Sequence, residues 1–412
     1  MCREAQYVPS VPNILFVAPY AMAATVRFVR AVAEVPGARV VVLSSDPVER
    51  FGDAPLDGHW HIADGFDVDS LAAAVAEVGD RMGGVDRLLG ILENLQVQLG
   101  EVRRRLGIPG IGPDVADNFR DKSRMKALFD AAGVPCARSR RVASGPEAIA
   151  FAEEIGYPFV AKPLAGAGAR NTFRVDSDAR LGDWLATSPP DAAQPMLLEE
   201  FITGQEHSFD SVMIGGEMTW HSVSRYLPSP LDVLEHPWIQ WCVLLPRHLD
   251  EHGDIVQVAR RALQALGQPD GLTHMEWFRR PDGSVAISEV GARPPGSQFM
   301  TLMSYAHDTD LYAAWARLMV DGHFDPPRRQ YACGGAYLRA QGSGRTISSI
   351  EGLDQVSEAT RNRVVEVSLP LARATPTGTY DGDGYVVVRD PDTGAVEAAL
   401  HEIISTVRVE VA

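Results

Sequence analysis

The feature that most restricts the fold of this chain is a pair of strand-like runs, within residues 273–290, that meet at a Pro-Asp-Gly turn. If Asp282 and Gly283 form a two-residue hairpin turn, the register places Glu276 directly opposite Glu289. The two carboxylates then share one face of the hairpin and lie roughly 5 Å apart.

Two unpaired glutamates at this spacing repel each other and destabilise a hairpin, whereas divalent cations turn the same geometry into a binding site. The alternative is a pair of solvated glutamates on an exposed ribbon. The neighbouring residues are largely apolar, which argues against an exposed ribbon. The hairpin therefore predicts metal ligands at Glu276 and Glu289.

Length, charge and cysteine content exclude several classes of protein. A chain of 412 residues is too long for one ordinary core, so we expect two or three domains. A formal charge of -16 repels nucleic-acid backbones and anionic membrane surfaces. The cysteines lie far apart without metal-ligand spacing, as expected of reduced thiols in a cytoplasm. They are Cys2, Cys136, Cys242 and Cys333.

The chain also lacks the sequence signals of export and membrane insertion. Residues 1–12 contain no charged leader followed by an apolar run, and no stretch of about 18 consecutive apolar residues occurs. We therefore expect a cytoplasmic protein that binds neither nucleic acid nor membranes.

The N-terminal part has the pattern of a parallel sheet. A short apolar run, residues 13–20, precedes a helix-compatible stretch and then the β-branched run 39–44. The first turn, residues 18–23, contains none of the glycines that a dinucleotide pyrophosphate requires. This pattern predicts a doubly wound α/β domain that does not bind NAD and that ends near the Gly/Pro-rich segment 107–113.

A second motif, residues 157–170, is a strand that ends in Lys162 and continues into a loop of small residues with Gly166 and Gly168. Backbone N–H groups of such a loop can close on phosphate oxygens, and the lysine adds a fixed positive charge. Alone, a loop of this kind is more often only a tight turn.

The strand-like run 196–202 follows this loop along the chain, at a separation that would suit a lid segment between the two. Its end can offer backbone groups to the edge of an adenine ring, with Phe201 and Ile202 as apolar walls. The alternative is an ordinary strand that ends in two surface acids, Glu199 and Glu200.

Taken together and in this order, these stretches resemble the ATP-grasp superfamily over roughly residues 13–325. The resemblance implies an ATP-grasp fold of the α/β and α+β classes. It implies a Rossmann-like pre-ATP-grasp domain in residues 1–115 and an ATP-grasp domain in residues 116–325, with a lid subdomain at about 136–202. A strand-rich C-terminal extension would fill residues 326–412.

The resemblance also implies roles for the residues at matching positions. Lys122 would contact nucleotide phosphate, Lys162 would hold the α- and β-phosphates, and Arg293 would neutralise the reacting carboxylate or acyl phosphate. Glu206 falls where the family often places a ribose-hydroxyl acceptor. The implied catalytic residues are Arg293 and Lys162, the nucleotide-binding residues are Lys122, Lys162, Gly166, Gly168, Glu199, Glu200, Phe201, Ile202 and Glu206, and the metal ligands are Glu276 and Glu289.

One position departs from the family pattern. The family commonly has Glu-x-Asn where this chain has Glu289-Val290-Gly291. Gly291 thus replaces the asparagine, which leaves the coordination of a second metal open. In the derived register His274 lies opposite Gly291. It could fill the vacancy or position the substrate, although a packed core histidine is the commoner reason for such a residue.

The resemblance implies a carboxylate–amine ligase similar to the L-amino acid ligases. Such an enzyme uses ATP and Mg²⁺, or Mn²⁺, to join a small carboxylate to an amine through an acyl phosphate, and releases ADP and phosphate. We also expect a homodimer.

Two other functions stay open at this point. A biotin-carboxylase-like carboxylase is disfavoured because residues 294–298 lack the expected Gln-Val-Glu-His run and no Met-Lys-Met occurs. A nucleotide-binding regulatory or scaffold protein without turnover stays open because of Gly291.

Overall fold

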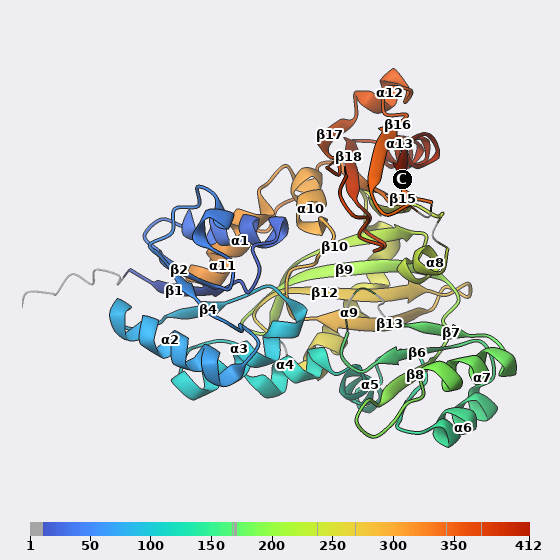
Figure 1. The fold of residues 1–412 in the computed structure, drawn as a ribbon, viewed down its shortest axis with the longest axis horizontal. Helices are drawn as coiled ribbons and strands as arrows, with labels where there is room; N and C mark the ends of the chain where they lie inside the picture. The colour runs from blue at the N-terminus through green and yellow to red at the C-terminus, as the bar shows by residue number, and fades with distance from the viewer. Residues whose placement is uncertain are drawn as a thin grey trace, which may run out of the picture. The chain divides into compact units, whose positions relative to one another are not determined.

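The computed structural model describes residues 11–412 except residues 167, 169, 170, 237, 268, 343 and 372. Cys2, the N-terminal ten residues and part of the predicted small-residue loop, Ala167 and Ala169, therefore lie outside the described residues. The described chain forms two compact units that alternate along the sequence (Figure 1). The first contains the residues up to 116 together with 311–325, and the second contains 117–310 together with 326–412.

The first unit is built on a parallel four-stranded sheet with the strand order β3-β2-β1-β4. All five residues of β1 are buried, as expected for a strand covered on both faces. The predicted strand, helix and parallel strand at the N-terminus are confirmed. The elements are β1 (Asn13–Val17), α1 (Ala23–Ala33), β2 (Arg39–Ser44), β3 (Gly58–His61), α2 (Val68–Met82), β4 (Arg87–Leu89), α3 (Gln96–Leu106), α4 (Pro113–Arg120), which contains the boundary, and α11 (Leu311–Asp321).

Helix α11 belongs to the first unit although it lies far along the chain. Trp315 packs edge-on against Phe28 of α1, with ring centroids 4.9 Å apart, and Tyr312 contacts the same ring. This aromatic cluster explains why residues 311–325 group with the N-terminal residues. The division into three domains at residues 115 and 325 stays a prediction.

The second unit begins with an antiparallel four-stranded sheet of order β5-β8-β6-β7. Its core includes Phe151 of α6, Phe159 of β6 and Trp184 of α7. The elements of this part are α5 (Lys122–Ala131), β5 (Ser139–Val142), α6 (Gly145–Ile155), β6 (Phe159–Pro163), β7 (Phe173–Val175), α7 (Asp178–Thr187) and β8 (Met196–Glu200).

The second unit also contains an eight-stranded sheet of order β13-β12-β9-β10-β11-β14-β18-β17 and, near the C-terminus, a separate three-stranded sheet of order β15-β19-β16. The strands from the β13 edge of the eight-stranded sheet to its middle, and the helices that accompany them along the chain, are β9 (Gln205–Ile214), β10 (Glu217–Leu227), α8 (Pro230–Glu235), β11 (Trp241–Leu245), α9 (Gly253–Leu266), β12 (Gly271–Arg279), β13 (Val285–Gly291) and α10 (Phe299–His307).

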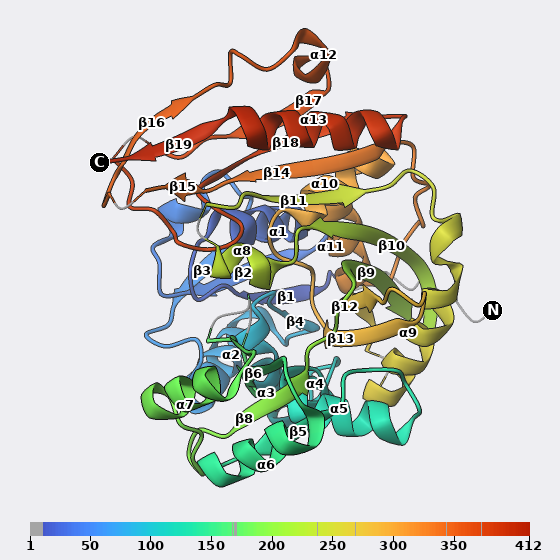
Figure 2. The same ribbon diagram turned by 90° about the vertical axis from the view of Figure 1, so that its right-hand side faces the viewer.

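The C-terminal region continues this sheet, because β14 pairs with β11 and β18 pairs with β14. Helix α13 packs on β14, as Figure 2 shows, and covers an apolar core. The elements are β14 (Ala332–Leu338), β15 (Ala340–Gln341), β16 (Ile347–Glu351), α12 (Glu358–Arg361), β17 (Val364–Ser368), β18 (Gly384–Asp390), α13 (Thr393–Thr406) and β19 (Arg408–Val411). The predicted strand-rich extension is confirmed. Across the described residues, every helix is too short or too polar to cross a membrane.

The hairpin of β12 and β13 has a longer turn than the two-residue turn that the sequence predicts. The predicted turn would pair Pro281 with Ser284, whereas the N–H of Arg280 donates to the carbonyl of Ser284 at 2.9 Å. Three residues therefore form the loop, and the last of them, Gly283, has a φ of +83°. A left-handed residue at this place is typical of three-residue hairpin loops. The prediction of a two-residue turn is wrong.

The predicted pairing of the two carboxylates is nevertheless confirmed. Trp277 pairs with Ile287, the register then shifts, and Glu276 pairs with Glu289. Ser288 is thus an extra residue on β13, a bulge that offsets the longer loop.

Candidate active site

A cavity of about 1000 Å³, its open mouth included, lies within the second unit. It is lined from α5, from β6 and the loop after it, from the end of β8, and from β9, β12 and β13. All residues that the sequence predicts for the site line this cavity except Arg293. They are Lys122, Lys162, Gly166, Gly168, Glu199, Glu200, Phe201, Ile202, Glu206, Glu276 and Glu289.

The cavity contains two charged clusters, of which the first, the hinge-end cluster, comprises Lys126, Lys162 and Glu199. Lys162 Nζ lies 2.6 Å from Glu199 Oε2, and Lys126 Nζ lies 3.2 Å from Glu199 Oε1. Burial alone would raise the pKa of Glu199, but the two lysines hold it below its ordinary value. Burial alone would lower the pKa of Lys162, but Glu199 raises it. Glu199 and Lys162 are therefore both charged at neutral pH.

Local geometry brings these side chains together. Lys162 pairs with Leu197 across β6 and β8, so Glu199 is its diagonal neighbour on the same face, within reach of a long side chain. Helix α5 begins after Asp121, whose carboxylate accepts hydrogen bonds from two backbone N–H groups and so caps the helix. Lys122 and Lys126 are four residues apart in α5 and share its cavity face.

The second group, the hairpin-end cluster, comprises Lys122, Glu276 and Glu289. Lys122 Nζ lies 3.0 Å from Glu289 Oε2 and also donates to the carbonyl of Gly166 at 3.1 Å. Within the described structure, Glu276 is paired only with His274, whose Nε2 lies 3.9 Å from Glu276 Oε1. This cluster holds two carboxylates and a single lysine.

The two carboxylates of the hairpin-end cluster respond to this imbalance in opposite ways. Burial and the charge of Glu289 raise the pKa of Glu276 to about 7. Burial would also raise the pKa of Glu289, but Lys122 and Lys162 outweigh it and lower that pKa to about 2. Glu276 is thus the group that lacks a cation.

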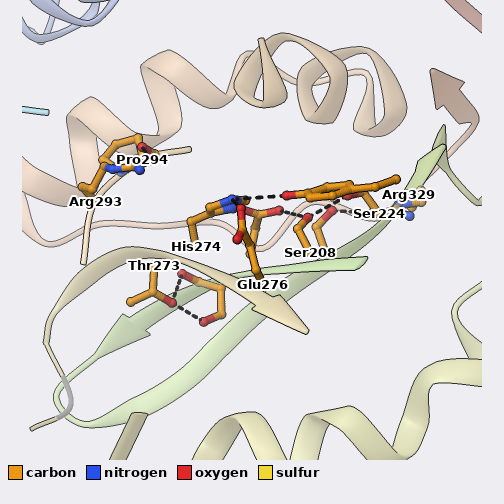
Figure 3. Close-up of polar contacts among 12 residues, drawn as sticks. Ser208, Ser224, Thr273, His274, Glu276, Arg293, Pro294 and Arg329 are labelled. Atoms are coloured by element: carbon orange, nitrogen blue, oxygen red, sulfur yellow. Dashed lines mark hydrogen bonds and ion pairs between the residues drawn. The ribbon is translucent and has the colours of Figure 1, made fainter. Parts of the chain in front are cut away.

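His274 lies beside Glu276, and its pairing with Gly291 confirms the predicted register. Its Nδ1 lies 2.7 Å from Oδ1 of Asp210, a carboxylate that is 1% exposed. Ser208 donates to the other oxygen of Asp210 at 2.9 Å, and Ser224 lies 2.7 Å from Ser208 (Figure 3). Burial lowers the pKa of His274, but Asp210 and Glu276 together raise it above its ordinary value. The network fixes the imidazole, whose Nε2 lies 3.5 Å from the hydroxyl of Tyr226 and 3.9 Å from Glu276 Oε1.

The hairpin-end cluster suits Mg²⁺ or Mn²⁺ because carboxylate oxygens are the ligands these ions prefer and because the cluster lacks positive charge. Within the part of the chain that the structure describes, no three His, Cys, Asp or Glu side chains are arranged to hold a metal. The remaining ligands would then be phosphate oxygens and water, as is usual for Mg²⁺.

The end of β8 and the two residues after it, Phe201 and Ile202, form the hinge segment and line the cavity. The carboxylate of Glu200 is held by Arg138 at 2.5 Å and Arg280 at 3.4 Å, and its backbone N–H donates to the carbonyl of Arg138 at 2.9 Å. Arg174 lies over the ring of Phe201, 4.3 Å from the centroid. Glu206 is 7% exposed, and burial together with Glu276 and Glu289 raises its pKa well above the ordinary value. A neutral Glu206 can both accept from and donate to a hydroxyl group.

Arg293 does not line the cavity. Its guanidinium donates to the carbonyl of Pro294 at 2.9 Å, and Figure 3 shows the side chain folded back beside this proline. Its charge still lowers the pKa of Glu289 and of Tyr380, so it lies near the hairpin end.

The cavity residues without a role in the sequence-based prediction include Lys126 and Tyr380. Lys126 shares a helical stripe with Lys122, and that spacing was its only signal in the sequence. Tyr380 lies in the C-terminal region, and no pattern in the sequence connects it with the other motifs.

Comparison with known proteins gives three kinds of similarity. Residues 121–214 match the family described as carbamoyl-phosphate synthase L chain, ATP binding domain. An L-arginine-specific L-amino acid ligase of Bacillus subtilis is 25% identical over 277 residues, which cover 65% of this chain and 66% of that protein. The alignment thus spans about two thirds of the relative's own length.

Solved structures resemble the whole fold. The L-amino acid ligase of Bacillus licheniformis has a TM-score of 0.79 at 19% identity and covers 98% of this chain and 100% of that chain. The biotin carboxylase domain of a Hydrogenobacter thermophilus 2-oxoglutarate carboxylase was solved with MgADP and bicarbonate. Its TM-score is 0.67 at 16% identity, and the match covers 96% of this chain and 90% of that chain. At these identities the likeness shows a shared fold.

Proposed function

Because the chain belongs to the ATP-grasp superfamily, we propose that it is an ATP-dependent carboxylate–amine ligase that forms an amide or peptide bond and releases ADP and phosphate. The observation that carries the proposal is the cavity in which a lysine-rich cluster and a carboxylate-rich cluster lie together. The first suits a polyphosphate and the second suits the cation that accompanies it.

The reaction begins when the substrate carboxylate attacks the γ-phosphorus of ATP, the bond from this phosphorus to the bridging oxygen of ADP breaks, and ADP leaves an acyl phosphate behind. Lys122 and Lys162 spread the negative charge that develops on the phosphoryl oxygens, and Arg293 neutralises the carboxylate. Glu276 and Glu289 would hold Mg²⁺, which would supply further neutralisation of the phosphate oxygens. The amine then displaces phosphate, and a closed glycine-rich loop keeps water from the acyl phosphate.

The nucleotide would lie along the cavity, with its base at the hinge. Phe201 and Ile202 would cover the adenine ring, and Glu206 would meet the ribose hydroxyls. The similarity to a carboxylase domain solved with MgADP supports ATP and Mg²⁺ as cofactors.

A screen of amino acids and other carboxylates for ADP and phosphate release tests the proposal. We expect release that depends on both a carboxylate and an amine, with an amide product. Formation of AMP and pyrophosphate would indicate adenylation and contradict the mechanism. Release that depends on bicarbonate alone would favour a carboxylase, and nucleotide binding without release would favour a regulatory protein.

We also propose a homodimer in the cytoplasm. The described cysteines Cys136, Cys242 and Cys333 are free thiols, which suits a reducing compartment. Sedimentation equilibrium of the purified protein gives the oligomeric state.

A further inference from the structure

Tyr380 is, among the described residues, the only part of the C-terminal region 326–412 that lines the cavity. It lies on a segment between β17 and β18, residues 377–383, which we call the strap.

One carboxylate of the strap accepts a hydrogen bond at each oxygen, one from within the strap and one from β15, which directly follows β14. Asp383 accepts from the N–H of Thr377 at 2.6 Å and from the N–H of Ala340 at 2.9 Å. The guanidinium of Arg339, a residue that is 7% exposed, donates to the carbonyl of Thr379 at 3.1 Å. These bonds fix the path of the strap. The side chain of Tyr380 then lies at the cavity wall.

The ring of Tyr380 lies between the core and the glycine-rich loop. Trp241 packs against it edge-on, with ring centroids 4.8 Å apart. A side chain on Gly168, which has a φ of +68°, would meet Tyr380 Cε1 at 3.4 Å. The ring therefore occupies the space beside the loop that is proposed to cover the phosphates.

The hydroxyl of Tyr380 points toward the segment that follows Arg293. It lies 3.4 Å from Ser297 Oγ, which is also 3.4 Å from Asp381 Oδ2. Ser297 and Gln298 have φ values of +44° and +60°, a conformation that costs free energy in residues with side chains and that often marks functional sites.

The charged groups that act on Tyr380 show that it lies at the hairpin end of the cavity. Burial raises its pKa above the ordinary value, Glu276 adds to the rise, and Arg293 opposes it. Tyr380 is thus a neutral phenol, able to donate a hydrogen bond, near the metal ligand and the arginine of the proposed site.

We propose that Tyr380 is a substrate-contacting residue, whose ring closes the phosphate end of the cavity and whose hydroxyl donates to an oxygen of the transferred phosphoryl group. The inference rests on the proposed function and gives the C-terminal region a direct part in it. Because the γ-phosphoryl group is present in ATP and missing from ADP, the two nucleotides separate this role from a general effect on the cavity.

The test compares the affinities of three variants for MgADP and for the magnesium complex of a non-hydrolysable ATP analogue, measured by calorimetry. We expect Tyr380→Ala to weaken binding of the analogue about tenfold, the effect of losing one hydrogen bond to a charged group, and binding of ADP less than twofold. Tyr380→Phe keeps the ring and therefore reports on the hydroxyl alone. It also replaces the alanine variant in the test if that variant does not fold. Tyr385→Phe is the matched control, because its hydroxyl bonds to Glu366 outside the cavity.

The inference is overturned if wild type binds both nucleotides and both Tyr380 variants bind the analogue as tightly as Tyr385→Phe does. An equal loss of affinity for both nucleotides also overturns it, because the contact would then not involve the γ-phosphoryl group. If wild type binds neither nucleotide, the proposed function fails and the inference fails with it.

Discussion

The two ends of the cavity carry charges in opposite proportions. In the hinge-end cluster two lysines hold one glutamate, and the side chains of Glu199 and Lys162 are only 7% and 11% exposed. In the hairpin-end cluster one lysine serves two glutamates, and the side chains of Glu276 and Glu289 are 26% and 28% exposed. The first cluster is paired within the protein, whereas the second lacks a cation.

This difference assigns separate tasks to the two ends. A buried carboxylate with two lysines keeps a net positive charge in place and attracts a polyphosphate. A carboxylate pair with one lysine costs free energy in the free protein, and a divalent cation removes that cost. Changes at the hinge end should therefore affect folding first, and changes at the hairpin end should affect ligand binding and turnover first.

The largest expected effect is on folding, at the hinge end. Glu199→Gln removes the charge that Lys126 and Lys162 share and leaves two buried ammonium groups unpaired. Loss of one partner of a buried ion pair typically costs about 3–5 kcal/mol. We expect the free energy of unfolding, measured by urea titration without ligand, to fall by about this amount.

Glu200→Gln is the control for this variant, because Glu200 is paired with arginines at a more exposed position, 22% for its side chain. The expected loss there is below about 1 kcal/mol. Equal losses in both variants would contradict the distinction between the two ends.

The next largest effect is on turnover, at the hairpin end. Glu289→Gln removes a metal ligand of the proposed site, and we expect substrate-dependent ADP release to fall by roughly 100-fold, the usual effect of losing one charge contact in the transition state. Raising the magnesium concentration should recover part of the rate. Normal turnover at saturating magnesium would contradict the metal site.

A smaller effect is on the stability of the metal-free protein, where we expect Glu276→Gln and Glu289→Gln to change the free energy of unfolding in opposite directions. The pKa of Glu276 in the folded protein is raised to about 7, so its ionisation destabilises the fold as pH rises through this value. At about 1.4 kcal/mol per pKa unit and with partial exposure, we expect Glu276→Gln to stabilise the metal-free protein by on the order of 2 kcal/mol at pH 8 and very little at pH 5.

Glu289→Gln should have the opposite sign. The pKa of Glu289 is lowered to about 2, so its charge stabilises the fold above its unfolded pKa, and this contribution is lost as pH falls toward 2. The variant should therefore be less stable than wild type at pH 8. Thermal denaturation of both variants without metal at pH 5 and pH 8 tests the pair, and two changes of the same sign would show that Lys122 does not distinguish the glutamates.

The smallest effect concerns His274, which positions Glu276 through its own bond to Asp210. A residue that orients a metal ligand typically changes metal affinity by about 10-fold or more when replaced. We expect His274→Asn to weaken Mn²⁺ binding, measured by electron paramagnetic resonance, by about 10-fold. His307→Asn is the control, since His307 bonds to the carbonyl of Met303 and lies outside the cavity. Equal affinities in the two variants would assign His274 a packing role only.

The hairpin shows both the power and the limit of the sequence. Side-chain alternation and the Pro-Asp-Gly turn were enough to predict that Glu276 faces Glu289, because polar and apolar positions repeat every two residues in a strand. The loop is one residue longer than predicted, and the bulge at Ser288 restores the pairing. A bulge depends on the balance of backbone hydrogen bonds along both strands, which the residue types at this position do not reveal.

Residues that act through distant contacts were the least predictable. The strands that carry Lys162 and Glu199 follow from local signals, and the structure has them where the sequence predicts. Lys126 was visible only as a member of a stripe, because its partner lies far along the chain. The contact of Tyr380 with the glycine-rich loop depends on the path of the whole C-terminal region.

The pairing of β14 with β11 has a consequence for the limits of the domain. All five residues of β11 are buried, and Cys242 and Leu244 pack into the core under α13. A chain that stopped at residue 325 would leave the hydrogen-bonding edge of β11 open beside an uncovered apolar surface. Such an edge is a template for pairing between molecules, so the shortened protein would be prone to aggregate. The last 87 residues, from 326 to 412, thus protect the sheet as well as extend it.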